Sequence, residues 1–214
     1  DSIIFRPATP DDPNRLLTFN RQENEEDSTL FVYCRMTGQA RYFYFEVYLG
    51  APELNLWFAN SSFENEGQIR ILSGRTFTCI DSRIQARIEM TSMNHVRITN
   101  NLLQESGRPT TIFSLNYSED ILINDNFITQ GAGIYISVAR DVEIIDNDCP
   151  REDAGWPYDA IVNSIGGDED DPLRDDSVSD NLNATFRNNH SWTGWSFTGQ
   201  GNLIVENDTL YRGS

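Results

Sequence analysis

The stretch ILINDNFI at residues 121–128 contains the pattern that decides the fold of this protein. Two apolar residues, Ile121 and Ile123, are separated by one spacer, and a polar turn residue, Asn126, follows after two more positions. Alternation at period two is typical of a strand with one buried face. Asparagine is favoured in tight turns. The unit therefore predicts a short strand that runs into a sharp corner.

The same unit recurs along most of the chain. Clear copies are VRITNNLL at 96–103 and VEIIDNDC at 142–149, and the copies start at residues 56, 77, 96, 121, 142, 184 and 203. Successive starts are 19 to 25 residues apart, except that the step from 142 to 184 spans two repeats. A second strand-like segment precedes five of the copies by eight residues, beginning at Ile69, Ile88, Phe113, Ile134 and Trp195. Repeated strands without helical periodicity predict a solenoid.

One polar position is shared by the copies. It holds Asn101, Asn126, Asn147 and Asn189 in the inner copies, and Ser61, Ser82 and Asp208 in the outer ones. Stacked side-chain amides can form a hydrogen-bonded ladder along the axis of such a stack. Asparagine also tolerates the left-handed backbone conformation that a sharp corner requires. We therefore expect a structural role for this column.

The segments VRITNN, ILINDN and VEIIDN resemble the repeats of the pectin-lyase-like superfamily. The segments SIIFRPATPDDP and ARYFYFEVYL near the start resemble coils of such proteins as well. The resemblance implies an all-β, right-handed parallel β-helix of about 8–9 coils, each of about 22 residues. The fold hosts lyases, hydrolases, epimerases, adhesins, viral spikes and structural proteins, so it implies no single activity.

The repeat predicts one β-helix domain over residues 1–214, as part of a larger protein or assembly. Residues 1–53 are expected to form irregular N-terminal coils, where YFYFEVYL from Tyr42 has the apolar positions without the polar turn residue. Residues 54–214 are expected to form regular coils. The step from the expected strand start at Ile161 to Ala184 is 23 residues instead of eight, so residues 166–180 are an insertion at one corner. Such corner insertions often form the binding surface of a solenoid.

This insertion, with GGDEDDPLRDD at residues 166–176, is the candidate metal site. Calcium takes six to eight oxygen ligands, which clustered carboxylates can supply. The alternatives are a solvated acidic loop and a set of catalytic carboxylates. The candidate calcium ligands are Asp168, Glu169, Asp170, Asp171, Asp175 and Asp176.

Aromatic residues surround the same corners. Trp156 and Tyr158 lie in the neighbouring long corner, DNDCPREDAGWPYDA at residues 146–160, and Trp192 lies close to the next copy. Aromatic faces line many ligand sites, so these three are candidate carbohydrate-binding residues. The alternative is that they anchor the loops and fill the core.

Composition excludes several classes of protein. The chain of 214 residues has a formal net charge of −17, and all its basic residues are arginine. It therefore repels phosphate backbones, and we expect no nucleic-acid partner. No apolar run is long enough to span a membrane. The odd number of cysteines, three, excludes a fully paired intrachain framework, and the chain opens on Asp1 without a signal-peptide pattern, as a mature form or an excised fragment would.

Five N-x-[ST] sequons favour an extracellular or cell-surface location. Asparagine preferences in turns explain some of them without a glycan. The candidate glycosylation sites are Asn60, Asn116, Asn183, Asn189 and Asn207.

The sequence favours no enzyme activity. The lyases of the resembled superfamily use calcium and an arginine or lysine base, and the absence of lysine leaves Arg151 and Arg187 as weak candidates. The signatures of its hydrolases and epimerases are missing, and the only histidines, His95 and His190, are expected at turns or on the surface. No catalytic residue is therefore assigned.

We expect a non-catalytic extracellular β-helix, a surface, filament or adhesion component with calcium and glycan binding. No other cofactor is expected. Its predicted partners are other subunits or further copies, joined through the end coils, and carbohydrate. The alternatives are a calcium-assisted polysaccharide lyase acting on uronate-containing glycans, and a viral or phage spike segment.

Overall fold

The structure is a computed structural model. It describes residues 3–5, 27–32, 34–37, 54–64, 68–71, 73–85, 87–104, 110–129, 132–149, 162–166, 182–193, 196–198 and 201–212. Within these ranges the chain is an all-β parallel solenoid without helices. Accordingly, the described part of the chain contains no helix of the length and apolarity that a membrane crossing requires.

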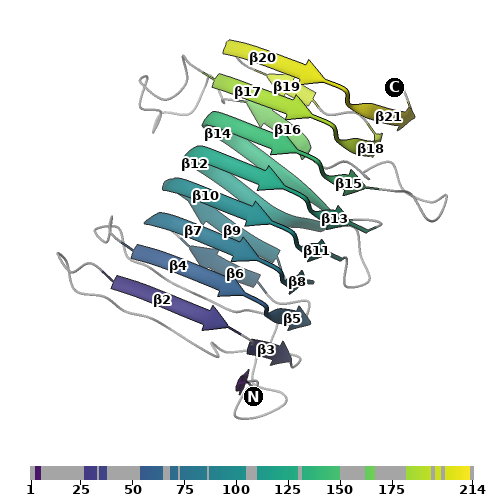
Figure 1. Ribbon diagram of the computed structural model, residues 1–214. Helices are drawn as coiled ribbons and strands as arrows, with labels where there is room; N and C mark the ends of the chain where they lie inside the picture. The colour runs from purple at the N-terminus through teal and green to yellow at the C-terminus, as the bar shows by residue number, and fades with distance from the viewer. Residues whose placement is uncertain are drawn as a thin grey trace.

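The strands stack in three parallel rows (Figure 1). The first row consists of β2 (Asp27–Val32), β4 (Leu54–Ala59), β7 (Gly74–Ile80), β10 (Met93–Thr99), the second halves of β12 (Thr110–Asn124) and β14 (Ala132–Ile145), β17 (Leu182–Arg187) and β20 (Gly201–Glu206). The third row consists of β6 (Gln68–Ile71), β9 (Arg87–Thr91), the first halves of β12 and β14, β16 (Val162–Gly166) and β19 (Ser196–Thr198). Because β12 and β14 run through a corner, these two rows form one 12-stranded sheet.

The second row is a separate sheet of nine short strands. In order they are β1 (Ile3–Phe5), β3 (Cys34–Thr37), β5 (Ser62–Glu64), β8 (Arg83–Ile84), β11 (Leu102–Leu103), β13 (Phe127–Ile128), β15 (Asp148–Cys149), β18 (His190–Thr193) and β21 (Thr209–Arg212). From β5 onward, each follows directly on a strand of the first row, after one sharp corner.

The observed register is the one that the repeat predicts. The seven predicted starts are aligned as Cα partners across the first row, in the order Leu56, Phe77, Val96, Ile121, Val142, Ala184 and Leu203. The third row aligns Ile69, Ile88, Phe113 and Ile134 in the same way. Because side chains alternate between the two faces of a strand, this register brings the apolar positions to one side.

Two details differ from the expectation. The register partner of Ile134 is Val162, whereas the repeat predicts Ile161, which lies outside the described residues; the register then shifts by one residue between Ile134 and Tyr135. The structure also supports about four turns, fewer than the eight or nine coils expected. These turns lie between residues 73 and 149, where the description is nearly continuous, whereas the two long corners and much of the N-terminal region lie outside it.

The N-terminal region contains a strand that the repeat did not reveal. In β2, Thr29 is the partner of Leu56, 27 residues earlier in the chain (56 − 29). The copy expected at Tyr42 lies outside the described residues. The repeat missed β2 because a threonine occupies the place of the first apolar residue.

The core lies between the three rows and is filled by apolar side chains. The aromatic rings of Phe58, Phe77 and Phe113 pack edge to face, with centroids 5.5 Å apart for the first pair and 6.2 Å for the second. Cys79 and Cys149 are buried and form no disulfide, so both cysteines act as small core residues. Burial raises the pKa of the Cys79 thiol far above its ordinary value. The core is therefore continuous along the axis of the stack.

We predict that Phe77→Ala lowers the free energy of unfolding by about 3–5 kcal/mol, because it leaves a cavity between two stacked rings. The measurement is chemical denaturation followed by tryptophan fluorescence. Thr78→Ala is the matched control, since Thr78 is the next residue of β7 and points to the outer face. Equal effects of the two variants would contradict this packing.

Candidate functional site

From β4 onward, the corner between each first-row strand and the following second-row strand turns at a residue with a left-handed backbone conformation. The φ angles of these residues lie between 48° and 56°. All are asparagine or aspartate, the residues that adopt this conformation most readily apart from glycine. They are Asn60, Asp81, Asn100, Asp125, Asp146, Asn188 and Asn207. The turn directs the following residue, which is the shared polar position of the repeat, into the core.

The structure brings Asn101, Asn126, Asn147 and Asn189 together in one buried stack, with no side chain more than 2 % exposed. The Oδ1 of Asn126 accepts hydrogen bonds from the backbone nitrogen and the Nδ2 of Asn101, both at 3.0 Å. The Nδ2 of Asn126 donates to the Ile98 carbonyl at 2.8 Å and to the Oδ1 of Asn147 at 2.9 Å. Each amide therefore ties one coil to both of its neighbours.

The two ends of this ladder are chemically different. At the N-terminal end, Ser82 donates from its backbone nitrogen to Asn101 Oδ1 at 2.9 Å, and Ser61 does so to Ser82 Oγ at 3.1 Å. At the C-terminal end, the Oδ1 of Asp208 accepts from the nitrogen and the Nδ2 of Asn189, at 2.6 and 3.1 Å. The Oδ2 of Asp208 is buried and has no hydrogen-bond partner. Desolvation by burial raises the pKa of Asp208 above its ordinary value.

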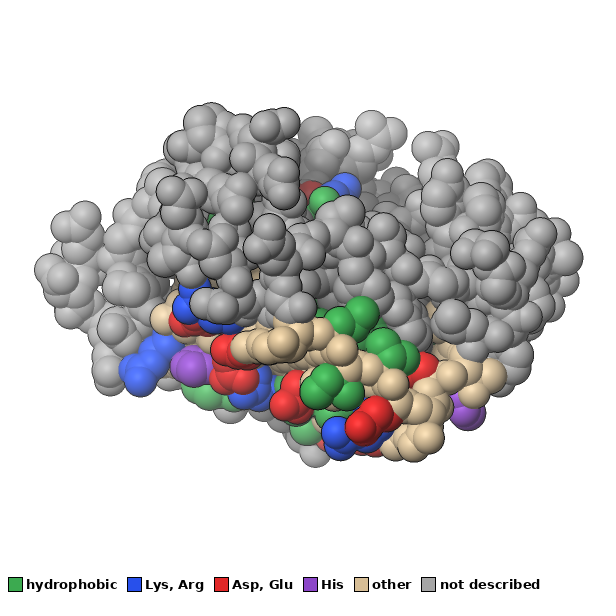
Figure 2. All heavy atoms as spheres, turned by 90° about the horizontal axis from the view of Figure 1, so that it is seen from above, with side chains coloured by type: hydrophobic (Ala, Val, Ile, Leu, Met, Phe, Trp, Pro, Cys, Tyr) green, Lys and Arg blue, Asp and Glu red, His purple; other side chains and the backbone are tan. Residues whose placement is uncertain are grey.

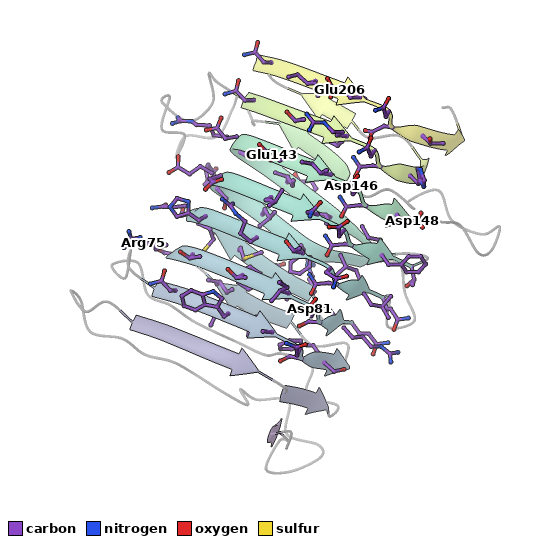
Figure 3. All side chains as sticks on the ribbon, viewed as in Figure 1. Arg75, Asp81, Glu143, Asp146, Asp148 and Glu206 are labelled. Atoms are coloured by element: carbon purple, nitrogen blue, oxygen red, sulfur yellow. The ribbon has the colours of Figure 1, made fainter. Side chains whose placement is uncertain are left out.

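The corner residues themselves form an exposed polar row beside the ladder. The Nδ2 of Asn188 donates to Asp146 at 2.9 Å, and the Nδ2 of Asn100 donates to Asp81. Figure 3 shows Asp81 and Asp146 at this corner in different coils, and Arg75 at the other end of the strands. Within the described ranges, no three histidine, cysteine, aspartate or glutamate side chains are grouped so that they could hold a metal ion.

The outer face of the first row carries one charged cluster. The guanidinium of Arg97 donates to both carboxylate oxygens of Asp120 at 2.7 Å and also to the Asp120 carbonyl. His95 Nδ1 lies 2.7 Å from Asp120 Oδ2. The hydrogen bond from Arg97 is the main reason why the pKa of Asp120 lies below its ordinary value. The guanidinium of Arg97 is thus held in a bidentate ion pair with Asp120.

Charges of both signs are mixed on the surface. Figure 2, seen from above, shows acidic, basic and apolar side chains next to one another among the described residues. Arg187, one of the two weak candidates for a base, lies in β17 and pairs with Glu206 at 3.0 Å. This ion pair is exposed, so Arg187 has the geometry of an ordinary surface cation.

Most of the predicted binding residues lie outside the described part of the chain. These are Arg151, Trp156, Tyr158 and the six candidate calcium ligands from Asp168 to Asp176. Trp192 lies in β18, but its side chain is outside the description. The strands β16 and β17 end at Gly166 and begin at Leu182, so the acidic corner connects the third row to the first.

The sequons fall in different environments. Asn60, Asn183 and Asn207 are exposed, and Asn116 is half-buried. Asn189 is fully buried, and its Nδ2 donates to the Ile144 carbonyl as well as to Asp208. Both amide hydrogens are therefore in use, which leaves no place for a glycan on Asn189 in the folded chain.

Sequence reasoning did not identify the row of polar residues that precedes the apolar starts. His95, Asp120, Asp141, Asn183 and Asn202 each directly precede a residue that the register aligns across the first row. Asn183 donates from Nδ2 to Asp141 at 2.8 Å, and Asn202 donates to Asn183 at 3.1 Å. The available signal was that this position is polar in each of these copies.

Comparisons with protein-family models, curated proteins and solved structures found no match for this chain.

We predict that Asn147→Ala destabilises the protein strongly. It leaves the backbone nitrogen and the Nδ2 of Asn126 without their acceptor, and each buried unsatisfied group costs about 1–3 kcal/mol. Chemical denaturation measures the loss. The control is Asn124→Ala, on the outer face at the end of β12 in the preceding coil, where surface substitutions change stability by about 0.5 kcal/mol or less. A loss of stability no greater than that of the control would show that the ladder hydrogen bonds do not stabilise the fold.

We also predict a pH-dependent effect of Asp120→Asn. Because the pKa of Asp120 is lowered in the folded protein, the stability it contributes is present above its ordinary value of 3.8 and is lost as pH falls through the lowered pKa. Wild type is therefore more stable than the variant near neutral pH, and the difference disappears in acid. Thermal denaturation across this pH range measures it, and Glu119→Gln is the neighbouring control. A difference that persists unchanged in acid would refute the assignment to Asp120.

Proposed function

We propose that this protein is a non-catalytic structural solenoid that assembles end to end with further copies of itself. The observation that carries the proposal is the exposure of Leu203 and Val205, at 47 % and 48 %, in the last strand of the first row. Their register partners in the preceding coil, Ala184 and Phe186, are at most 2 % exposed. The last coil thus presents to the outside the apolar side chains that the other coils bury.

Strand polarity supports a second copy as the occupant. Among the described strands, β2 and β20 are the two edges of the first row, and β1 and β21 are the two edges of the second. All pairings in both rows are parallel. The N-terminal edge of one copy therefore has the strand direction that the C-terminal edge of another requires. A head-to-tail contact of this kind continues indefinitely and produces a filament.

An open strand edge is a strong driving force for such pairing. Its unpaired N–H and C=O groups form a template for another strand, and natural sheets usually protect their edges. Here the edge strand β20 also carries the exposed apolar side chains of Leu203 and Val205, so backbone hydrogen bonding and apolar burial both favour association. Each fully buried Leu or Val side chain contributes about 1.5–3 kcal/mol.

The charge of the chain opposes this assembly. A formal net charge of −17 produces repulsion between copies, which salt and divalent cations reduce. We propose that the protein works outside the cell, where calcium and salt screen its acidic faces. The exposed sequons at Asn60, Asn183 and Asn207 are in keeping with that location.

The chemistry of the outer faces also favours a structural role. Arg97 and Arg187 pair with acidic residues, and so do Arg87 with Glu89 and Arg140 with Glu119. Paired arginines are ordinary surface features of an acidic protein. None of these pairs has the arrangement of a nucleophile or a base next to a second catalytic group.

We predict that the double variant Leu203→Lys and Val205→Lys abolishes assembly, because it places two charges in the contact. Sedimentation velocity in about 0.5 M salt, where the Debye length is only a few ångströms, measures the size distribution. Wild type is expected to form species larger than the monomer. Ile204→Lys is the control, since Ile204 is equally exposed but points to the outer face. Wild type that stays monomeric at all salt and calcium concentrations, at acidic as well as at neutral pH, would overturn the proposal.

A further inference from the structure

Asp208 occupies a place in the ladder that the inner coils give to asparagine. Its Oδ1 accepts from Asn189, as the Oδ1 of each asparagine accepts from the preceding coil. Its Oδ2 stands in the place of Nδ2. An amide nitrogen donates hydrogen bonds, whereas an ionised carboxylate oxygen only accepts them. The last corner therefore differs from the others by one missing donor.

The register identifies the acceptor that this donor would serve. The Nδ2 of Asn126, Asn147 and Asn189 donates to the carbonyls of Ile98, Ile123 and Ile144, at 2.8 to 2.9 Å. Ile144 is the register partner of Phe186, so the Phe186 carbonyl is the equivalent acceptor for residue 208. The Oδ2 of Asp208 is buried without a partner. In an ionised Asp208, the Oδ2 would thus face the Phe186 carbonyl, and both oxygens would be hydrogen-bond acceptors without a donor between them.

We propose that Asp208 carries a proton in the folded protein, that its Oδ2 donates to the Phe186 carbonyl, and that loss of this proton loosens the last coil and blocks stacking on it. The blocking step rests on the end-to-end assembly proposed above.

Burial opposes the ionised form of Asp208 more strongly than the neighbouring groups favour it. His190 in β18 is the nearby group that lowers the pKa of Asp208, together with the hydrogen bonds from Asn189, and desolvation outweighs both. The other charged residues of the adjoining strands are Arg187 and Glu206, which pair with each other, Asp148, which is aligned with His190, and Arg212 in β21.

The sign of the pH dependence follows from these groups. Since the folded pKa lies above the ordinary value of 3.8, the stability contributed by the neutral acid is complete below that value. It is lost as pH rises through the raised pKa. The last coil is therefore expected to loosen as pH rises, which is opposite in direction to the effect expected for Asp120.

The first experiment tests the proton in the monomer. Protection factors of the amides in β20 and β21 are measured by hydrogen exchange between about pH 4 and 8, at low salt and low protein concentration. Wild type is expected to lose protection as pH rises, about tenfold for each unit by which the pKa is raised. Asp208→Asn restores the donor, so its protection should be high and independent of pH. Asp125→Asn removes an exposed carboxylate beside the ladder and should follow wild type.

The second experiment tests the coupling to assembly. Sedimentation in high salt at about pH 4 and about pH 8, the two ends of the exchange series, should show wild-type assembly only at the lower pH, and assembly of Asp208→Asn at both. If neither protein assembles while protection still depends on Asp208, the proton is established and the proposed assembly is refuted. If both assemble equally at both pH values, the coupling is wrong although the assembly stands. If protection depends on pH in the same way in wild type and in Asp208→Asn, the proposed protonation of Asp208 is wrong.

Discussion

The hydrogen bonds of the buried corner amides are the constraint on which this solenoid depends. A polar side chain inside an apolar core is costly unless its donors and acceptors are paired. At Asn126 and Asn147 all of these groups find partners, and apart from the Ile145 carbonyl, which also accepts from Asn147, the partners lie in neighbouring coils. A coil therefore cannot satisfy its own corner, and the repeat is stable only as a stack. The same dependence holds for the apolar side chains, which are covered by the coil above and the coil below.

This dependence explains why the ends of the stack differ from its middle. At the N-terminal end of the ladder, Ser82 and Ser61 turn their hydroxyls back to carbonyls of their own strands, at Ile80 and Ala59. At the other end, Asp208 leaves one oxygen without a partner, and Leu203 and Val205 are exposed. The unpaired carboxylate oxygen and the exposed apolar side chains therefore lie at the same, C-terminal end of the ladder. The proposed association and the proposed proton binding both concern this end.

Much of the fold was predictable, because the information is local and repeated. Alternating apolar residues and the corner asparagine mark each strand, and the alignment from Leu56 to Leu203 follows the predicted starts. Where a copy departs from the pattern, prediction failed for a physical reason. Thr29 occupies an apolar position of β2, and β16 pairs with Ile134 through Val162, next to a register shift. The irregular corners carry most of the candidate binding residues, and no repeat constrains their conformation.

The sequence by itself determined which residues alternate inward, where each coil turns, and which polar side chain follows each turn. These properties depend on neighbours within one repeat. Only the tertiary structure decided that Arg97 pairs with Asp120, that Asn189 is too deeply bonded for a glycan, and that one oxygen of Asp208 is left unpaired. Each of these depends on which side chain lies directly above or below, at a distance of 19 to 45 residues along the chain. Stacking brings such residues into contact, and no pattern within a single repeat contains that information.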